Sequence, residues 1–218
     1  MKQRSILFLL TLVAILTVSA TSDNRQEAVA LYQKAKKYEK GEGVEKDLEK
    51  AAQLYLKAAE MGLDSAQNMI GNCYDDAVGI FQDKEKAVFW YHKAAEQGYA
   101  PAQANLAICY SLGKGVPVDE KIALEWIQKA AAQGSISGMM QLAEAYYSGG
   151  VVPKDYQKAK ELVEQVIKKN SNHKRAQYYL QRINKNIKEQ QLAAAPDRAE
   201  RKWPRPRTRG RLTHMRRP

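Results

Sequence analysis

Two short motifs in the sequence could support nucleophilic chemistry. Ser111 and Lys114 have the S-x-x-K spacing, and Ser22, Asp23 and Asn24 form S-D-N. Enzymes that react with penicillins use both motifs, with the serine as nucleophile. The context argues against this use, because S-x-x-K here spans a predicted helix end and a glycine loop, and the third motif, K-T-G, is absent. We therefore expect no catalytic residue, and an enzyme that acts on β-lactams stays an alternative.

The residues that bind metals or phosphates show no useful spacing. The three histidines, His92, His173 and His214, fall in different predicted elements, and none pairs at metal-ligand spacing. The sequence contains neither a G-x-x-x-x-G-K-[ST] nor a G-x-G-x-x-G phosphate loop. We expect no metal site and no cofactor.

A period of 36 residues organises most of the chain. The hexapeptides at residues 57–62, 93–98 and 129–134 read KAAEMG, KAAEQG and KAAAQG. Tyrosine and aspartate recur in the same register without an insertion, at Tyr38, Tyr74, Tyr110 and Tyr146 and at Asp47, Asp83, Asp119 and Asp155. Self-similarity at such a period is typical of an array of helical repeats.

Each copy of the repeat predicts two helices. The first begins at Ser65, Pro101 or Ser137 and ends near Gly41, Ala77, Gly113 or Gly149; the aspartate caps the second. The second helix ends with the KAA motif at Gly62, Gly98 or Gly134, where we expect a left-handed backbone. In the fourth copy Asn170 takes this place, and asparagine is the next best residue for that conformation.

Residues 102–134 resemble the Sel-one-like repeat, a relative of the tetratricopeptide repeat. The matching residues are Ala102, Leu106, Ala107, Tyr110, Gly113, Gly115, Val116, Asp119, Ala123, Trp126, Lys129, Ala130, Ala131 and Gly134. The resemblance implies an all-α, right-handed α-solenoid over residues 28–192. Its repeats would span 28–64, 65–100, 101–136 and 137–172, followed by a capping helix at 173–192. The chain departs from the pattern at Lys34, in place of an aliphatic residue, and at Val151, in place of a loop glycine.

Partner-binding positions follow from the same resemblance, which implies that the first helices line a concave side. These positions are Tyr32, Lys36, Asn68, Asn72, Asp75, Ala104, Ile108, Ser111, Met140, Glu144 and Tyr147. Their mixture of aromatic, amide, apolar and charged side chains suits recognition of a protein or peptide. The alternative is that they are ordinary solvated helix positions.

Cys73 and Cys109 occupy the same position in neighbouring repeats. An even number of cysteines in a secreted chain favours a disulfide. Packed helices, however, lie about 8–10 Å apart, whereas a disulfide needs Cα atoms within about 7 Å. We favour two free, partly buried thiols, with a Cys73–Cys109 disulfide as the alternative.

The two ends of the chain differ from the repeats in composition. Residues 1–20 place two cations before an apolar run and end in Val18-Ser19-Ala20, which predicts a secretory signal peptide cleaved near Ala20. We expect a linker at 21–27, a periplasmic or secreted mature chain, and no transmembrane span in it. Residues 193–218 form a basic tail rich in Arg and Pro, which accounts for most of the formal net charge of +11.

The sequence therefore favours a non-catalytic scaffold that binds a protein or peptide on the concave face of a solenoid in the bacterial envelope or outside the cell. The alternatives are a weak β-lactamase, described for some cysteine-rich relatives, and a protein whose basic tail contacts an anionic surface. We do not expect a nucleic-acid partner, because the folded part of the chain is almost neutral.

Overall fold

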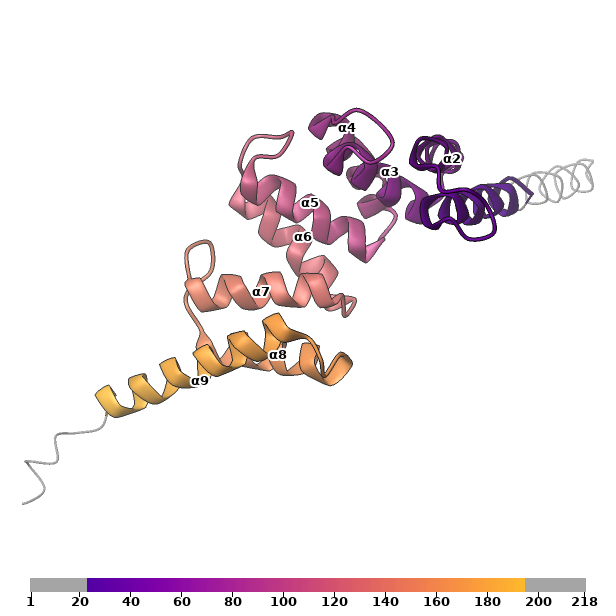
Figure 1. Cartoon of the computed structure of the whole chain (residues 1–218). Helices are drawn as coiled ribbons and strands as arrows, with labels where there is room; N and C mark the ends of the chain where they lie inside the picture. Colours follow the sequence, from indigo (N-terminus) through magenta and orange to yellow (C-terminus); the bar gives the residue numbers. More distant parts are fainter. Residues whose placement is uncertain (1–22, 195–218) are drawn as a thin grey trace, which may run out of the picture.

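The structure is a computed structural model that describes residues 23–194, and within that range all regular elements are helices (Figure 1). Residues 23–40 are helical. They are followed by α2 (Leu48–Glu60), α3 (Asp64–Asp76), α4 (Lys84–Glu96), α5 (Ala100–Leu112), α6 (Glu120–Ala132), α7 (Ile136–Ser148), α8 (Tyr156–Lys169) and α9 (Lys174–Ala194). No helix in this range is long and apolar enough to cross a membrane.

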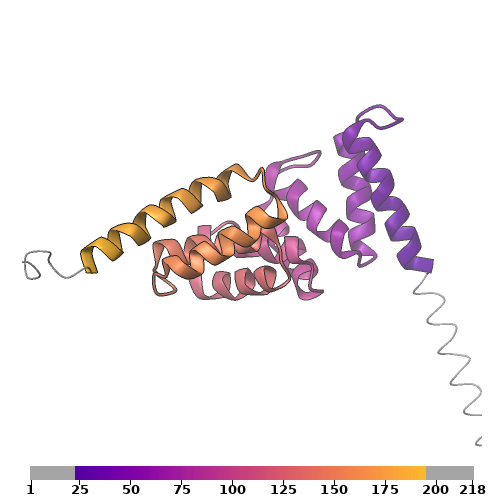
Figure 2. The same ribbon diagram turned by 90° about the horizontal axis from the view of Figure 1, so that it is seen from below.

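The helices form an elongated array in which each one packs against the next along the chain (Figures 1 and 2). Four helix pairs follow one another, starting with residues 23–40 and α2, and α9 packs on the last pair. The prediction of an all-α solenoid of helical repeats with a C-terminal helix is confirmed.

The second helix of every pair begins at the predicted aspartate. Each of these carboxylates accepts a hydrogen bond at 2.9–3.0 Å from a backbone N–H two or three residues later. Such a cap contributes about 1 kcal/mol to helix stability. The residues concerned are Asp47, Asp83, Asp119 and Asp155.

The second helices end as predicted in three of the four copies. Gly62, Gly98 and Gly134 have φ values of +90°, +86° and +76°. The prediction for Asn170 is wrong, because its backbone is extended, with φ −145° and ψ 94°. Its side-chain Oδ1 instead accepts the N–H of Asn172 at 3.1 Å, a local turn that asparagine forms readily.

The outer boundaries also differ from the prediction. Residues 23–27, assigned to a linker, belong to the helix that runs to residue 40, and residues 193 and 194, assigned to the tail, belong to α9. The proposed signal peptide at 1–20, the rest of the linker, and residues 195–218 of the tail lie outside the described residues.

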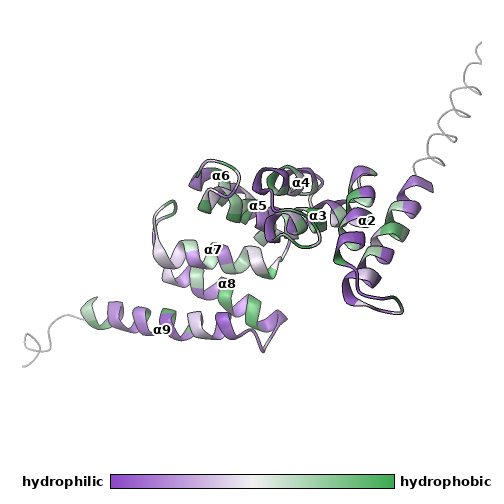
Figure 3. Ribbon diagram, turned by 45° about the horizontal axis from the view of Figure 1, so that its top comes forward, coloured by the Kyte–Doolittle hydropathy of each residue, from purple (hydrophilic) through white to green (hydrophobic). Residues whose placement is uncertain are grey.

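The KAA motif is buried between neighbouring helices, where its small side chains let the backbones approach. Ala58, Ala59, Ala94, Ala95 and Ala130 are each at most 2% exposed. The core built around such contacts falls into two clusters, one from residues 23–40 to α5 and one from α7 to α9. Figure 3 shows the accompanying alternation of apolar and polar helix faces.

Candidate binding surface

One of the predicted partner-binding positions is an inter-repeat packing position. Asn68, Ala104 and Met140 occupy it in successive first helices and are 5%, 1% and 4% exposed. Side chains this deeply buried cannot contact a partner, so the prediction is corrected for Asn68 and Met140. The sequence pattern placed them inward but could not tell inward-facing from packed.

The amide at the next predicted position, Asn72, joins a polar network between repeats 2 and 3. Its Oδ1 accepts hydrogen bonds from the Tyr91 hydroxyl at 2.9 Å and from Asn105 Nδ2 at 3.2 Å. Asn105 Nδ2 also lies 3.0 Å from Asn68 Oδ1. The hydrogen-bonding capacity of these amides is thus used largely within the solenoid.

Asp75 is similarly occupied. Its carboxylate lies 2.6 Å from Lys84 Nζ and 3.7 Å from Lys114 Nζ.

Ser111 donates its hydroxyl proton to the carbonyl of Ile108 at 3.1 Å. Ser111 and Lys114 therefore contact different groups, and the geometry gives no support to a serine nucleophile activated by this lysine. Ser22 of the S-D-N motif lies outside the described residues.

At the first repeat, Tyr32 and Lys36 are half-buried. The Tyr32 ring packs against Tyr55 with centroids 5.4 Å apart, and Lys36 Nζ lies 5.8 Å from the Tyr32 ring centroid. Burial raises the pKa of the Tyr32 hydroxyl. Ile108 in repeat 3 is half-buried as well.

The remaining two predicted residues, Glu144 and Tyr147, belong to a larger cluster on α7, α8 and α9. We call it the tyrosine–arginine surface, and it consists of Glu144, Tyr147, Tyr156, Arg175, Tyr178, Tyr179 and Arg182. The Tyr147 ring is its centre, with centroid distances of 5.5 Å to Tyr156 and 5.7 Å to Tyr179. Tyr147 OH also accepts a hydrogen bond at 3.1 Å from Asn186 Nδ2 of α9.

Two arginines of α9 lie over these rings. The Arg182 guanidinium is 5.6 Å from the centroids of both Tyr147 and Tyr178, and its Nη1 donates to Tyr178 OH at 3.0 Å. Arg175 Nη2 lies 2.6 Å from Glu144 Oε1, and its guanidinium is 6.0 Å from the Tyr179 ring. Stacked arginines of this kind keep donors free for a second partner.

The surface combines fixed side chains with exposed ones. Glu144 is partly buried, and desolvation raises the pKa of its carboxyl group although Arg175 acts in the opposite direction. Tyr178, in contrast, is 53% exposed, and Arg175 and Arg182 are exposed beside it.

The contribution of α9 was missed because residues 173–192 were interpreted only as a cap. A signal was present in the sequence, since Arg175, Tyr179, Arg182 and Asn186 follow each other at spacings of three or four residues, with Tyr178 four residues before Arg182. That spacing puts them along one side of a helix.

The cysteines and histidines form no site within residues 23–194, where no group of three or more His, Cys, Asp or Glu could hold a metal. Both thiols are free and buried, and desolvation raises the pKa of each to about 11. His173 caps α9 by accepting the Ala176 N–H on Nδ1 at 3.1 Å. His92 lies 3.4 Å from Glu96 Oε1, and His214 is outside the described residues.

A comparison with protein families matches the four helix pairs and ends before α9. The Sel1 repeat model matches residues 19–37, 38–63, 64–99, 100–135 and 136–171. The chain belongs to the Sel1 repeat family. The first two matches are shorter than the others and together cover the first helix pair.

Solved structures of other Sel1 repeat proteins are similar to this chain. A Sel1 repeat protein from Oxalobacter formigenes is 31% identical, with a TM-score of 0.65 over 70% of this chain and 62% of its own. The protein c5321, a protective antigen present in uropathogenic Escherichia coli strains, is 31% identical, with a TM-score of 0.51 over 78% and 43%. The chain thus spans less than two thirds of the length of either relative.

A comparison with curated proteins gave no match. Members of the Sel1 repeat family are known as protein–protein interaction scaffolds, and their fold is typically non-enzymatic.

Proposed function

We propose that this Sel1 repeat protein is a non-catalytic scaffold that binds a protein or peptide through the tyrosine–arginine surface of α7, α8 and α9. The observation that carries the proposal is the composition of this surface. Tyrosine and arginine dominate the residues whose truncation weakens protein complexes most, because they combine large apolar area with donors. Here both residue types are gathered at adjoining first helices, with Tyr147 fixed by packing and Tyr178 and Arg182 open.

The chemistry of the surface indicates the kind of partner. Arg175 and Arg182 supply planar donors that match carboxylates, and the adjacent rings supply apolar contacts. A segment with an aromatic or aliphatic side chain next to Asp, Glu or a C-terminal carboxylate fits this arrangement.

We further propose that the scaffold works in the envelope or outside the cell. The support is the composition of residues 1–20, with cations before a short apolar run and a small-residue cleavage site. The description of the related E. coli protein as a protective antigen agrees with such a location. N-terminal sequencing of the protein recovered from its native cell tests this point, and a chain that retains residues 1–20 would contradict it.

The binding proposal is tested by affinity capture from the native extract, with the full chain as bait. A bait that carries Tyr178→Ala and Arg182→Ala should lose the partner that the unchanged bait retains. We expect the affinity of the recovered partner to fall at least tenfold, since a pair of central contacts typically costs more than about 1.4 kcal/mol.

The chain offers a closely matched control on α4. Phe89 and Lys93 are also four residues apart, the ring is 51% exposed, and Lys93 Nζ lies 4.8 Å from its centroid. The Phe89→Ala, Lys93→Ala bait should retain the partner. Loss of the partner from both double variants, or from neither, would contradict the assignment of binding to α7 and α9.

A further inference from the structure

The loops between the two helices of a pair meet the preceding repeat in two different ways. In repeats 2 and 3 the loop passes directly over the first turn of the preceding second helix. Gly79 and Gly115 lie so close to it that a Cβ atom would overlap the carbonyls of Leu48 and Lys84, respectively. Both glycines have positive φ, +68° and +69°, so other residues would also be strained there.

Repeat 4 has Val151 at this position, which is the departure from the repeat pattern seen in the sequence. A valine could not enter the space that Gly115 occupies without meeting backbone atoms. The loop takes another path, in which the positive φ falls on Gly150, at +110°, and a Cβ on Gly150 would meet nothing within 4 Å. At this point the loop of repeat 4 stays clear of α6, whereas the loops of repeats 2 and 3 touch α2 and α4. A cavity of about 560 Å³ lies beside the contact at Gly79.

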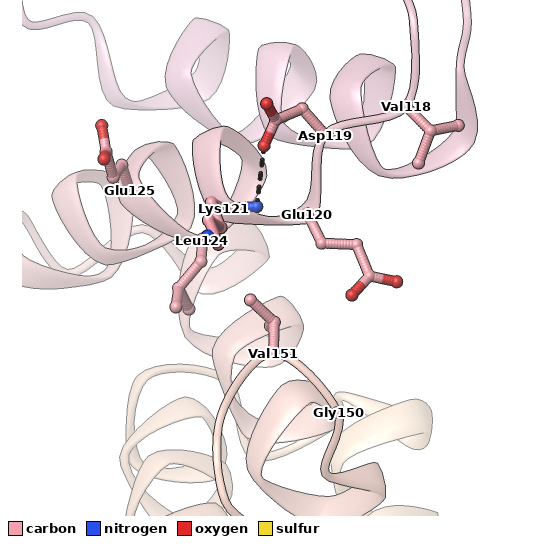
Figure 4. A pocket seen from close by; sticks show the side chains of 8 residues that line it. All are labelled: Val118, Asp119, Glu120, Lys121, Leu124, Glu125, Gly150 and Val151. Carbon is pink, nitrogen blue, oxygen red and sulfur yellow. Dashed lines mark hydrogen bonds between the residues drawn. The ribbon is translucent and has the colours of Figure 1, made fainter.

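The junction between repeats 3 and 4 forms a larger cavity of about 790 Å³ at the start of α6, which we call the α6 notch. Figure 4 shows Val151 directed towards Leu124, with Glu120 beside them. A smaller cavity of about 240 Å³ shares these three residues and reaches Ile127. The notch is lined by Val118, Asp119, Glu120, Lys121, Leu124, Glu125, Gly150 and Val151.

The lining has an apolar floor and an acidic rim. Leu124 and Val151 face each other, and Val118, which is 60% exposed, lies apart from them at the edge of the notch. The Asp119 carboxylate caps α6 by accepting hydrogen bonds from backbone N–H groups of its first turn. Lys121 is the one cation among the lining residues. Glu120 and Glu125 are exposed, and among the described residues neither forms an ion pair.

We propose that the α6 notch is a second docking site, which takes a segment of a partner protein with an aliphatic side chain flanked by Lys or Arg. The aliphatic side chain packs against Leu124 and Val151, where it loses contact with water. The flanking cations pair with Glu120 and Glu125. The site is separate from the tyrosine–arginine surface and has the opposite charge, so the two surfaces select different segments.

The test measures binding of short fluorescent peptides to the full chain by anisotropy. The peptides alternate arginine with leucine, glutamate with leucine, and arginine with serine. We expect the arginine–leucine peptide to bind, and the other two to bind at least about tenfold more weakly, since each lacks one of the two interactions.

Two variants of the chain locate the peptide. Glu120→Gln with Glu125→Gln removes the acidic rim, and Val151→Gly restores the residue that closes the other junctions. Each should weaken binding of the arginine–leucine peptide about tenfold while leaving the helical content unchanged. The control, Glu60→Gln with Glu85→Gln, makes the same change in net charge at exposed positions of α2 and α4 and should leave binding unchanged.

Three outcomes would overturn the proposal. The first is absence of binding, and the second is equal weakening by the notch variants and the control. The third is binding that appears only when the chain ends at residue 194, because residues 195–218 are themselves basic and would then be the occupant in place of a partner.

Discussion

The junctions on either side of repeat 3 differ in the loops that enter them, which read GKGVPVD at residues 113–119 and GGVVPKD at residues 149–155. At the junction of repeats 2 and 3, Gly115 lets the loop rest on the first turn of α4. At the junction of repeats 3 and 4, Val151 prevents the same contact with α6, and a cavity remains. The loop that has Val151 in place of the glycine therefore lacks the close contact with the preceding second helix that Gly115 makes.

The first helices show a parallel difference. In repeat 2 the side chains of Asn72 and Asp75 are bound by Asn105 and Lys114 of repeat 3 and by Lys84 of repeat 2 itself. In repeat 4 the same repeat positions hold Glu144 and Tyr147, which organise the exposed residues of α9. Asn72 and Asp75 are therefore bound within the solenoid, whereas Glu144 and Tyr147 of repeat 4 contact exposed side chains of α9.

The largest effect is expected from opening the closed junction. Gly115→Val should lower the free energy of unfolding by about 3 kcal/mol, because the valine is strained at φ +69° and overlaps the backbone of Lys84. Urea unfolding followed by circular dichroism measures this loss.

Gly43→Val is the matched control, since Gly43 holds the same repeat position with φ +73° and a Cβ there meets nothing within 4 Å. The free energy of unfolding of this variant should fall by only about 1–2 kcal/mol, because the valine adds backbone strain but no overlap with another helix. If both variants lost the same free energy of unfolding, the contact between the loop and the preceding helix would not contribute to stability.

The next effect concerns Cys73 and Cys109, which both lie in the N-terminal core cluster. With each pKa raised to about 11 from 9, the folded chain holds about a hundredfold less thiolate at pH 8 than the unfolded chain. Reaction with a thiol reagent should be slower by at least that factor, and the rate should rise with pH. A native rate equal to that in urea would contradict the closed core.

Removing the amide network should have a smaller effect. Asn105→Ala loses hydrogen bonds to the buried Asn68 and the half-buried Asn72 and leaves their Oδ1 atoms without that donor, which should cost about 1–2 kcal/mol in urea unfolding. Gln141→Ala, at the same position of repeat 4, loses one bond of 3.3 Å to the Ala104 carbonyl and one to Ser137 near solvent. It should cost about 0.5 kcal/mol or less. A larger loss from Gln141→Ala would reverse the proposed difference between the junctions.

Val151→Gly should change stability least, within about 1 kcal/mol, because closure of the notch offsets the greater freedom of glycine in the unfolded chain. Hydrogen exchange of the first turn of α6 measures the closure directly, and we expect slower exchange at residues 120–124. Unchanged or faster exchange there would mean that Val151 is not what keeps the notch open.

The sequence sufficed for the fold because the repeat places every cap and helix end in register. The aspartates at 47, 83, 119 and 155 and the glycines at 62, 98 and 134 act through local hydrogen bonds and backbone angles, which a sequence displays directly. Asn170 was mispredicted because its side chain has a competing local hydrogen bond that glycine lacks.

The candidate site was only partly predictable. Glu144 and Tyr147 were identified from their repeat offsets, but the same reasoning selected Asn68 and Met140, which the next repeat buries. Burial between repeats depends on how closely successive pairs pack, and the period does not encode that. The arginines and tyrosines of α9 were missed because a cap has no landmark residues against which to count offsets.

The central claim is that the C-terminal repeat and α9 bind the partner while the N-terminal repeats support them. Hydrogen exchange of the full chain, alone and saturated with the captured partner, tests it most directly. The account predicts slower exchange in the bound state at residues 141–151 and 175–186, with α2, α3 and α4 unchanged. Protection confined to α2–α4, with α7 and α9 unaffected, would contradict it.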